Sequence, residues 1–203
     1  MALKGKRIYI TYGRFQPVTW GHENSFNVIK KKALANGCPY RIFVSHSHNS
    51  NTDPLKQDVK IKWMKILLGE HADNIIGINP SDPQTCVRYC MKKVNGVIPE
   101  DYDECVYMVG SDRVNAMQYL HKYNGCNPKA AVIDFSMKHF EVLSTGQRDA
   151  DGKTFSISGT KMRNWARTKD LVEFKKGLPK MATDDKSRYK VSNEEILEFM
   201  SLL

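Results

Sequence analysis

Short apolar runs alternate with amphipathic stretches along most of the chain. An apolar run over residues 7–12 is followed by a loop, a helical pattern over 21–36 and a second apolar run over 40–45. The helical pattern comes from apolar residues three or four positions apart, namely Phe26, Ile29 and Ala33. A strand, a loop, a helix and a second strand in this order are typical of a parallel α/β unit.

The same alternation continues to about residue 176. It predicts further strands at 74–78, 105–109, 130–134 and 140–143, and further helices at 56–68, 83–95, 112–123, 160–167 and 169–176. The run 105–109 is apolar throughout and stops at Gly110, as expected of a strand that is buried on both faces. We therefore predict an α/β fold, a Rossmann-like doubly wound parallel sheet with helices on both faces and a short helical C-terminal extension.

The C-terminal part has a different pattern. Residues 178–191 are basic and weakly patterned, which predicts a mobile linker. Ser192 and Glu195 then form a capping-box signature in front of an apolar repeat, which predicts a terminal helix that docks on the body. We divide the chain into a main domain over 1–180 and a linker with a helix over 181–203, packed on the same domain.

Composition narrows the class of protein. With 203 residues, of which 41% are hydrophobic, the chain can build one packed core. No apolar run approaches the ~18 residues of a membrane span, and the N-terminus turns polar too early for a secretory leader, so we expect a cytoplasmic protein without a membrane partner. The five cysteines are then expected to be free thiols, and Cys86 and Cys90 lack the two further ligands that a structural metal site needs. We predict no protein-bound metal site.

Charge is distributed unevenly along the chain. The net charge of +9 divides into +8 over residues 1–62, −3 over 63–152, +7 over 153–191 and −3 over 192–203. Two basic segments around an acidic middle suit an anionic ligand, although a nucleic-acid face or a merely solvated surface would have the same charge pattern.

The loop after the first strand carries the first candidate chemistry. It joins a strand end to a helix start, where unpaired N–H groups and the helix dipole favour a phosphate. His22 could donate a hydrogen bond to an α-phosphate oxygen, and Thr19 could offer its hydroxyl to the same group. A loop that starts a helix and contains an incidental histidine is the alternative. The candidate phosphate-binding residues of this loop are Gly13, Arg14, Phe15, Gln16, Thr19, Gly21 and His22.

A second candidate cluster lies in the other basic segment. Here a helix start combines small hydroxyl residues with two cations in its first turn, which suits an anion as well. A capped helix with solvated charges is the alternative. The residues concerned are Ser158, Thr160, Lys161 and Arg163.

Together the two clusters resemble the nucleotidyltransferase superfamily with paired His-x-Gly-His and Ile-Ser-x-Thr-x-x-Arg signatures, to which class I aminoacyl-tRNA synthetase domains also belong. The Gly-Arg-Phe-Gln-Pro opening is similar to archaeal-type nicotinamide mononucleotide adenylyltransferases, and the tail from Thr145 to Pro179 is similar to nucleotidyltransferases carried by large bacteriophages. The run 109–114 resembles a Gly-x-Asp loop, which adds Gly110 and Asp112 to the candidates. Thr19 stands where the first histidine is expected, as in pantetheine-phosphate adenylyltransferases, and Gly159 replaces the second serine.

The resemblance implies transfer of AMP from ATP to nicotinamide mononucleotide, giving NAD and pyrophosphate. It implies that His22 and Thr19 act at the α-phosphate, that Arg163 with Lys161 and Arg14 holds the β- and γ-phosphates, and that Mg²⁺ is bound mainly by phosphates and water. Asp112 is expected at a ribose hydroxyl, and His46 and His48 are either acceptor ligands or ordinary polar loop residues.

Alternatives remain at this point. Pantetheine phosphate with ATP, or a polyol phosphate with CTP, would use the same chemistry. An RNA-binding protein is an alternative of another class, prompted by the basic segments. We expect ATP and a small phosphorylated acceptor as partners, do not expect nucleic acid, and leave the oligomeric state open.

Overall fold

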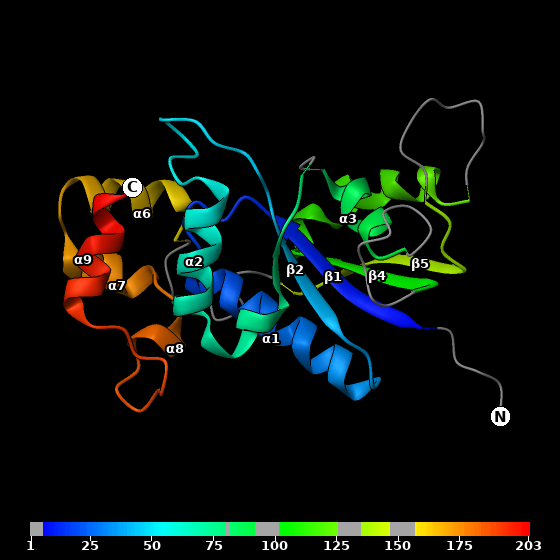
Figure 1. The fold of residues 1–203 in the computed structure, drawn as a ribbon, viewed down its shortest axis with the longest axis horizontal. Coiled ribbons are helices and arrows are strands. Elements are labelled where there is room, and N and C mark those ends of the chain that lie inside the picture. Colours follow the sequence, from blue (N-terminus) through cyan, green and yellow to red (C-terminus); the bar gives the residue numbers. More distant parts are fainter. Residues whose placement is uncertain (1–5, 80–81, 92–101, 126–134, 147–156) are drawn as a thin grey trace.

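A five-stranded parallel sheet forms the centre of the computed structural model, which describes residues 6–79, 82–91, 102–125, 135–146 and 157–203 (Figure 1). The strand order is β3-β2-β1-β4-β5, so the direction of winding reverses at β1. Ligands of such sheets bind at the carboxyl ends of the strands beside this reversal. The strands are β1 (Arg7–Gly13), β2 (Tyr40–Val44), β3 (Ile75–Gly77), β4 (Glu104–Val109) and β5 (His139–Ser144).

Helices cover both faces of the sheet. The α-helices are α1 (Trp20–Ala35), α2 (Gln57–Leu67), α3 (Pro83–Tyr89), α5 (Val114–Met117), α6 (Gly159–Arg167), α7 (Leu171–Gly177), α8 (Lys180–Thr183) and α9 (Asn193–Ser201). Tyr9 points into the core with α1, α2 and the C-terminal helices, whereas Ile8 and Ile10 point into a second core with α3. Successive side chains of a strand face opposite sides of a sheet, so one apolar run contributes to both cores. The predicted doubly wound parallel α/β fold is confirmed.

The region after β4 differs from the predicted helix over 112–123. It consists of a 3-10 turn at Ser111–Arg113, the single-turn helix α5 and a second 3-10 turn at Gln118–Tyr123. Ser111, Val114, Asn115, His121 and two tyrosines of this region are weaker helix formers than alanine or leucine, which fits the short pieces. The predicted strand 130–134 lies outside the described residues, and so does the end of the predicted helix 83–95. The described part of that helix is α3, which ends at Tyr89.

The segment 178–191 was predicted to be a mobile linker, and this prediction was wrong for its first half. It contains α8, and the buried carboxylate of Glu23 accepts hydrogen bonds from the backbone N–H groups of Lys180 and Met181. Burial raises the pKa of Glu23, while these two N–H donors act in the opposite direction. A contact between residues so distant in sequence leaves no local pattern.

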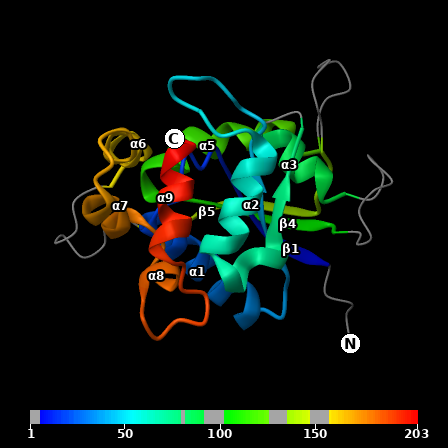
Figure 2. The same cartoon turned by 60° about the vertical axis from the view of Figure 1, so that its left-hand side comes forward.

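The terminal helix α9 begins where its capping box predicts. Ser192 Oγ accepts the N–H of Glu195 at 3.2 Å, and Glu195 Oε2 accepts the N–H of Ser192 at 2.9 Å. The helix lies beside α2 (Figure 2). The rings of Phe199 and Trp63 stack between the two helices with centroids 4.7 Å apart. The division at residue 180 stays a prediction.

Two further findings concern the described residues only. None of their helices is both long and apolar enough to cross a bilayer. The described cysteines, Cys38, Cys86, Cys90 and Cys105, form no disulfide, while Cys126 lies outside the described part.

Candidate active site

A pocket of about 690 Å³ lies where the winding of the sheet reverses. Its wall is formed by the β1–α1 loop, by the ends of β4 and β5, by Thr52 and Asp53 of the β2–α2 loop, and by the beginning of α6. The N-termini of α1 and α6 therefore border one cavity, although more than 130 residues separate them in sequence. Two helix N-termini provide unpaired N–H groups and positive potential, which favour a polyphosphate.

His22 lies in the first turn of α1 and is held there by the preceding cap residue. The backbone N–H of Thr19 donates to His22 Nδ1 at 3.0 Å, and Thr19 Oγ1 lies 2.9 Å from the same nitrogen. The ring thus occupies the place that a glutamate takes in a capping box. Because Nδ1 accepts a hydrogen bond, the neutral ring carries its proton on Nε2, and His22 can act as a donor toward a ligand in the pocket.

Aromatic rings pack against the His22 side chain. The ring of Phe15 packs edge-on against His22 at 5.2 Å and against Phe26 at 5.5 Å. Phe15 adopts a φ of 48°, an uncommon conformation for a residue with a side chain. A Cβ atom at Gly13 would lie 2.6 Å from the Phe15 ring. Gly13 is therefore needed to make room for this ring, in addition to any approach to a phosphate.

Arg163 joins α6 to the β1–α1 loop. Its Nη1 donates to the backbone oxygen of Gln16 at 2.6 Å and its Nη2 donates to Thr160 Oγ1 at 3.2 Å. A Cβ atom at Gly159 would lie 2.6 Å from the same Gln16 oxygen, so a serine does not fit here without a backbone shift. Burial lowers the pKa of Arg163, and the nearby carboxylate of Asp53 acts against this effect.

The loop between β2 and α2 forms the third side of the pocket. Gln16 holds it through both ends of its amide, since Nε2 donates to Leu55 O at 2.8 Å and Oε1 accepts from Leu55 N at 3.0 Å. The Gln16 side chain is thus engaged by Leu55, although the residue lines the pocket as predicted. Arg167 of α6 also donates to Asn51 O at 3.3 Å, so the β2–α2 loop is bonded to α6 as well.

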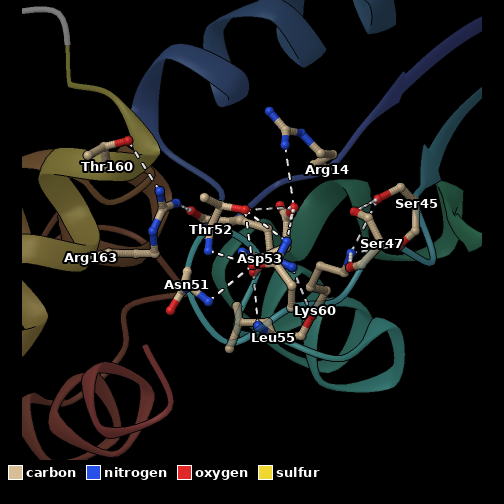
Figure 3. Close-up of polar contacts among 12 residues, drawn as sticks. Arg14, Ser45, Ser47, Asn51, Thr52, Asp53, Leu55, Lys60, Thr160 and Arg163 are labelled. Carbon is tan, nitrogen blue, oxygen red and sulfur yellow. Dashed lines mark hydrogen bonds and ion pairs between the residues drawn. The ribbon is translucent and has the colours of Figure 1, made fainter.

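Lys60 anchors the beginning of this loop from inside the protein. It is only 1% exposed, and its Nζ donates to the backbone oxygens of Ser45 at 2.6 Å and Ser47 at 3.0 Å (Figure 3). Burial lowers its pKa to about 8, and the carboxylate of Asp53 raises it against this effect.

The structure gathers most of the predicted site residues at one pocket. Those that line it are Gly13, Arg14, Phe15, Gln16, Thr19, Gly21, His22, Gly110, Ser158, Thr160 and Arg163. Lys161 and Asp112 are exposed and do not line it, and neither do His46 and His48. Ser158 also caps α6 by accepting the N–H of Lys161 at 3.2 Å.

Several residues at the pocket were not predicted. Arg113 lines it, whereas its neighbour Asp112 is directed to the Arg113 side chain at 3.5 Å. Asp53 lines the pocket from the β2–α2 loop. The only signal in the sequence that could have indicated this is that Asp53 follows the strand next to β1. Tyr12 and Tyr107 line the side near β4 and lie within predicted strands, where no local pattern separates them from residues of the core.

Comparison with known proteins adds information on the fold. Neither the protein-family models nor the curated proteins contain a match to this chain. Among solved structures, 38 chains match. One is the Plasmodium falciparum nicotinic acid mononucleotide adenylyltransferase complexed with APC, with a TM-score of 0.51, 12% sequence identity and coverage of 98% of both chains. The similarity extends over the whole chain and is one of fold.

Proposed function

We propose that this protein is a nucleotidyltransferase that transfers AMP from ATP to nicotinamide mononucleotide, giving NAD and pyrophosphate. The observation that carries the proposal is the junction of two helix N-termini at one pocket, with Arg163 of the second bonded at 2.6 Å to the loop that precedes the first. The fold neighbour, whose name describes a nicotinic acid mononucleotide adenylyltransferase, supports the nucleotidyltransferase class and leaves the acceptor to the lining of the pocket.

The proposed reaction needs little covalent chemistry from the protein. An oxygen of the acceptor phosphate attacks the α-phosphorus of ATP, a new P–O bond forms, and the bond to the β-phosphate oxygen breaks so that pyrophosphate leaves with its electron pair. The acceptor is already an anion, so no general base is required. The protein acts by positioning the reactants and by stabilising the negative charge that develops on the α-phosphate.

Four side chains have roles in this scheme. His22 donates from Nε2 to an α-phosphate oxygen. Thr19 acts through His22, since its N–H and hydroxyl both lie at Nδ1, and it is therefore a positioning residue. Arg163 and Arg14 supply positive charge for the β- and γ-phosphates.

Magnesium enters this scheme with the nucleotide. Among the described residues, no three His, Cys, Asp or Glu side chains come together as a metal-binding group. The donors at the pocket fit a Mg²⁺ that is ligated by phosphate oxygens and water, which is the usual arrangement for Mg-ATP. Such an ion neutralises part of the negative charge on the phosphates. His22, Arg163 and Arg14 then need to balance only the negative charge that is left.

The acceptor is inferred from the lining of the pocket. Near β4 the wall carries Tyr12, Tyr107 and Met117 beside the guanidinium of Arg113. Aromatic and thioether groups suit a flat heteroaromatic ring, and an arginine suits a phosphate. This combination favours a mononucleotide over a polyol phosphate.

A panel of substrates tests the proposal. Purified protein is incubated with Mg²⁺ and either ATP or CTP, together with nicotinamide mononucleotide, nicotinic acid mononucleotide, pantetheine phosphate or glycerol phosphate, and pyrophosphate release is measured. We expect release with ATP and nicotinamide mononucleotide. Release with nicotinic acid mononucleotide and not with nicotinamide mononucleotide would retain the reaction type and reject the acceptor. Release with pantetheine phosphate or with CTP would retain the reaction type and reject the acceptor or the base. Absence of release in every mixture would reject the proposed function.

A further inference from the structure

Asp53 is the only acidic residue among the described residues that line the pocket. It is 4% exposed, and its Oδ2 lies 3.4 Å from Arg14 Nη1 (Figure 3). A buried carboxylate is unexpected in a cavity that is otherwise suited to phosphates, because like charges at short range repel each other.

The position of Asp53 is fixed by its own loop. Asn49 Nδ2 and Thr52 Oγ1 donate to Oδ2 at 3.2 and 3.3 Å, and the backbone N–H of Asn49 donates to Asp53 O at 2.9 Å. Asn49 Oδ1 in turn accepts the N–H of Thr52 at 2.7 Å. These contacts hold the carboxylate at the pocket wall independently of Arg14.

Three basic side chains lie within the electrostatic reach of this carboxylate. Asp53 raises the pKa of Lys60 and of Arg163, in both cases against the lowering by burial. Lys60 and Arg163 are buried and bonded to backbone oxygens. Arg14 differs from them, because its side chain is 64% exposed and its contact with Asp53 is long. It can leave Asp53 at small cost, since ion pairs with an exposed partner contribute little.

We infer that Asp53 is an intramolecular counter-ion of the phosphate site. Without nucleotide it attracts Arg14, and when ATP binds Arg14 turns from Asp53 to the phosphates. Asp53 then remains beside the bound polyphosphate as a negative charge that has lost its Arg14 partner, which weakens the binding of ATP and of the departing pyrophosphate. This inference rests on the proposed function and makes Asp53 a residue that sets affinity and product release.

Binding measurements with four variants test this inference. The probes are an ATP analogue with a methylene group between the α- and β-phosphates and inorganic pyrophosphate, both titrated calorimetrically in the presence of Mg²⁺. Asp53→Asn keeps an oxygen for Asn49 and Thr52 but removes the charge. Arg14→Gln removes the cation, and the double variant combines both changes. Asp73→Asn is the control, since Asp73 is exposed and lies before the amino end of β3, whereas Asp53 lies in the loop after the carboxyl end of the adjacent β2.

We expect Asp53→Asn to bind both probes about fivefold to tenfold more tightly, with the thermal midpoint nearly unchanged. Asp73→Asn should leave both affinities unaltered. Arg14→Gln should weaken the binding of the ATP analogue at least about fivefold. The gain from Asp53→Asn should be smaller in the Arg14→Gln background, because part of it comes from the release of Arg14.

Equal or weaker binding by Asp53→Asn at an unchanged thermal midpoint would overturn the inference. If Asp53→Asn lowers the thermal midpoint strongly, the test passes to Arg14→Gln. Unaltered or tighter binding of the ATP analogue by Arg14→Gln would mean that Arg14 stays with Asp53, and it would overturn the inference. Failure of the proposed function has a different signature. A wild-type protein that binds both probes but releases no pyrophosphate in the substrate panel would reject the reaction and leave the role of Asp53 in binding intact.

Discussion

Substitution of His22 by asparagine and by glutamine separates the two roles that the structure gives to this ring. His22 Nδ1 accepts from the Thr19 N–H at 3.0 Å, while the proton on Nε2 is the one that the proposed reaction directs to a phosphate. Asparagine places an oxygen close to the position of Nδ1 and has nothing at Nε2. Glutamine places an amide nitrogen close to the position of Nε2 and has no acceptor at Nδ1.

The magnitudes follow from these two contacts. Loss of one preorganised donor at a developing oxyanion costs about 3–4 kcal/mol, so His22→Asn should lower kcat about 10²- to 10³-fold. Because the cap is retained, its thermal midpoint should change little. His22→Gln should lose about 1 kcal/mol of stability with the cap and retain a larger part of the activity.

The assay is steady-state formation of NAD at saturating ATP and nicotinamide mononucleotide, with thermal unfolding measured on the same preparations. The role of His22 as a phosphate donor would be refuted if His22→Asn lost less than tenfold in kcat. It would also be refuted if the two variants lost kcat equally, because the ring would then act only through the cap.

Three further predictions concern stability and the junction of the two helices. Burial lowers the pKa of His71 to about 4 from 6.5, so the stability that the neutral ring provides is complete above pH 6.5 and is lost as the pH falls toward 4. In urea unfolding at several pH values the wild type should lose about 3 kcal/mol over this range and His71→Gln should not, and parallel curves of unfolding free energy against pH would contradict this. Gly159→Ala brings a Cβ to within 2.6 Å of Gln16 O, so it should lower the free energy of unfolding by about 1–3 kcal/mol and weaken the binding of ATP. An unchanged KM for ATP would disprove the effect on binding. Phe199→Ala removes the stack on Trp63 and should destabilise by about 3–5 kcal/mol in urea unfolding, whereas a loss below about 1 kcal/mol would mean that α9 packs loosely.

The parts of the site that the sequence predicts are those with a local signature. The β1–α1 loop and the start of α6 each combine a helix N-terminus with small residues and a cation, and both lie at the pocket. Parallel strands bring the loops that follow them to one edge of the sheet, so both loops are expected at that edge. The prediction that His22 and Arg163 share one site comes from the resemblance of their two signatures to those of nucleotidyltransferases.

The parts that could not be predicted depend on contacts between distant residues. Gln16 has the appearance of a phosphate ligand in sequence, and only the fold shows that Leu55, 39 positions away, engages both ends of its amide. Glu23 likewise binds the backbone of residues near 180. The choice between Asp112 and Arg113 depends on which side of a short 3-10 turn faces the pocket, and periodicity does not settle this for a segment of three residues.

The central claim is that the bond at the α-phosphorus of ATP is the one that reacts. The most direct measurement uses ATP labelled in the α-phosphate and, separately, ATP labelled in the γ-phosphate, each incubated with Mg²⁺, nicotinamide mononucleotide and the protein. We predict that the α-label appears in NAD and the γ-label in pyrophosphate. Appearance of the γ-label on the acceptor would identify phosphoryl transfer instead, and retention of both labels in ATP would contradict any transfer reaction with this acceptor.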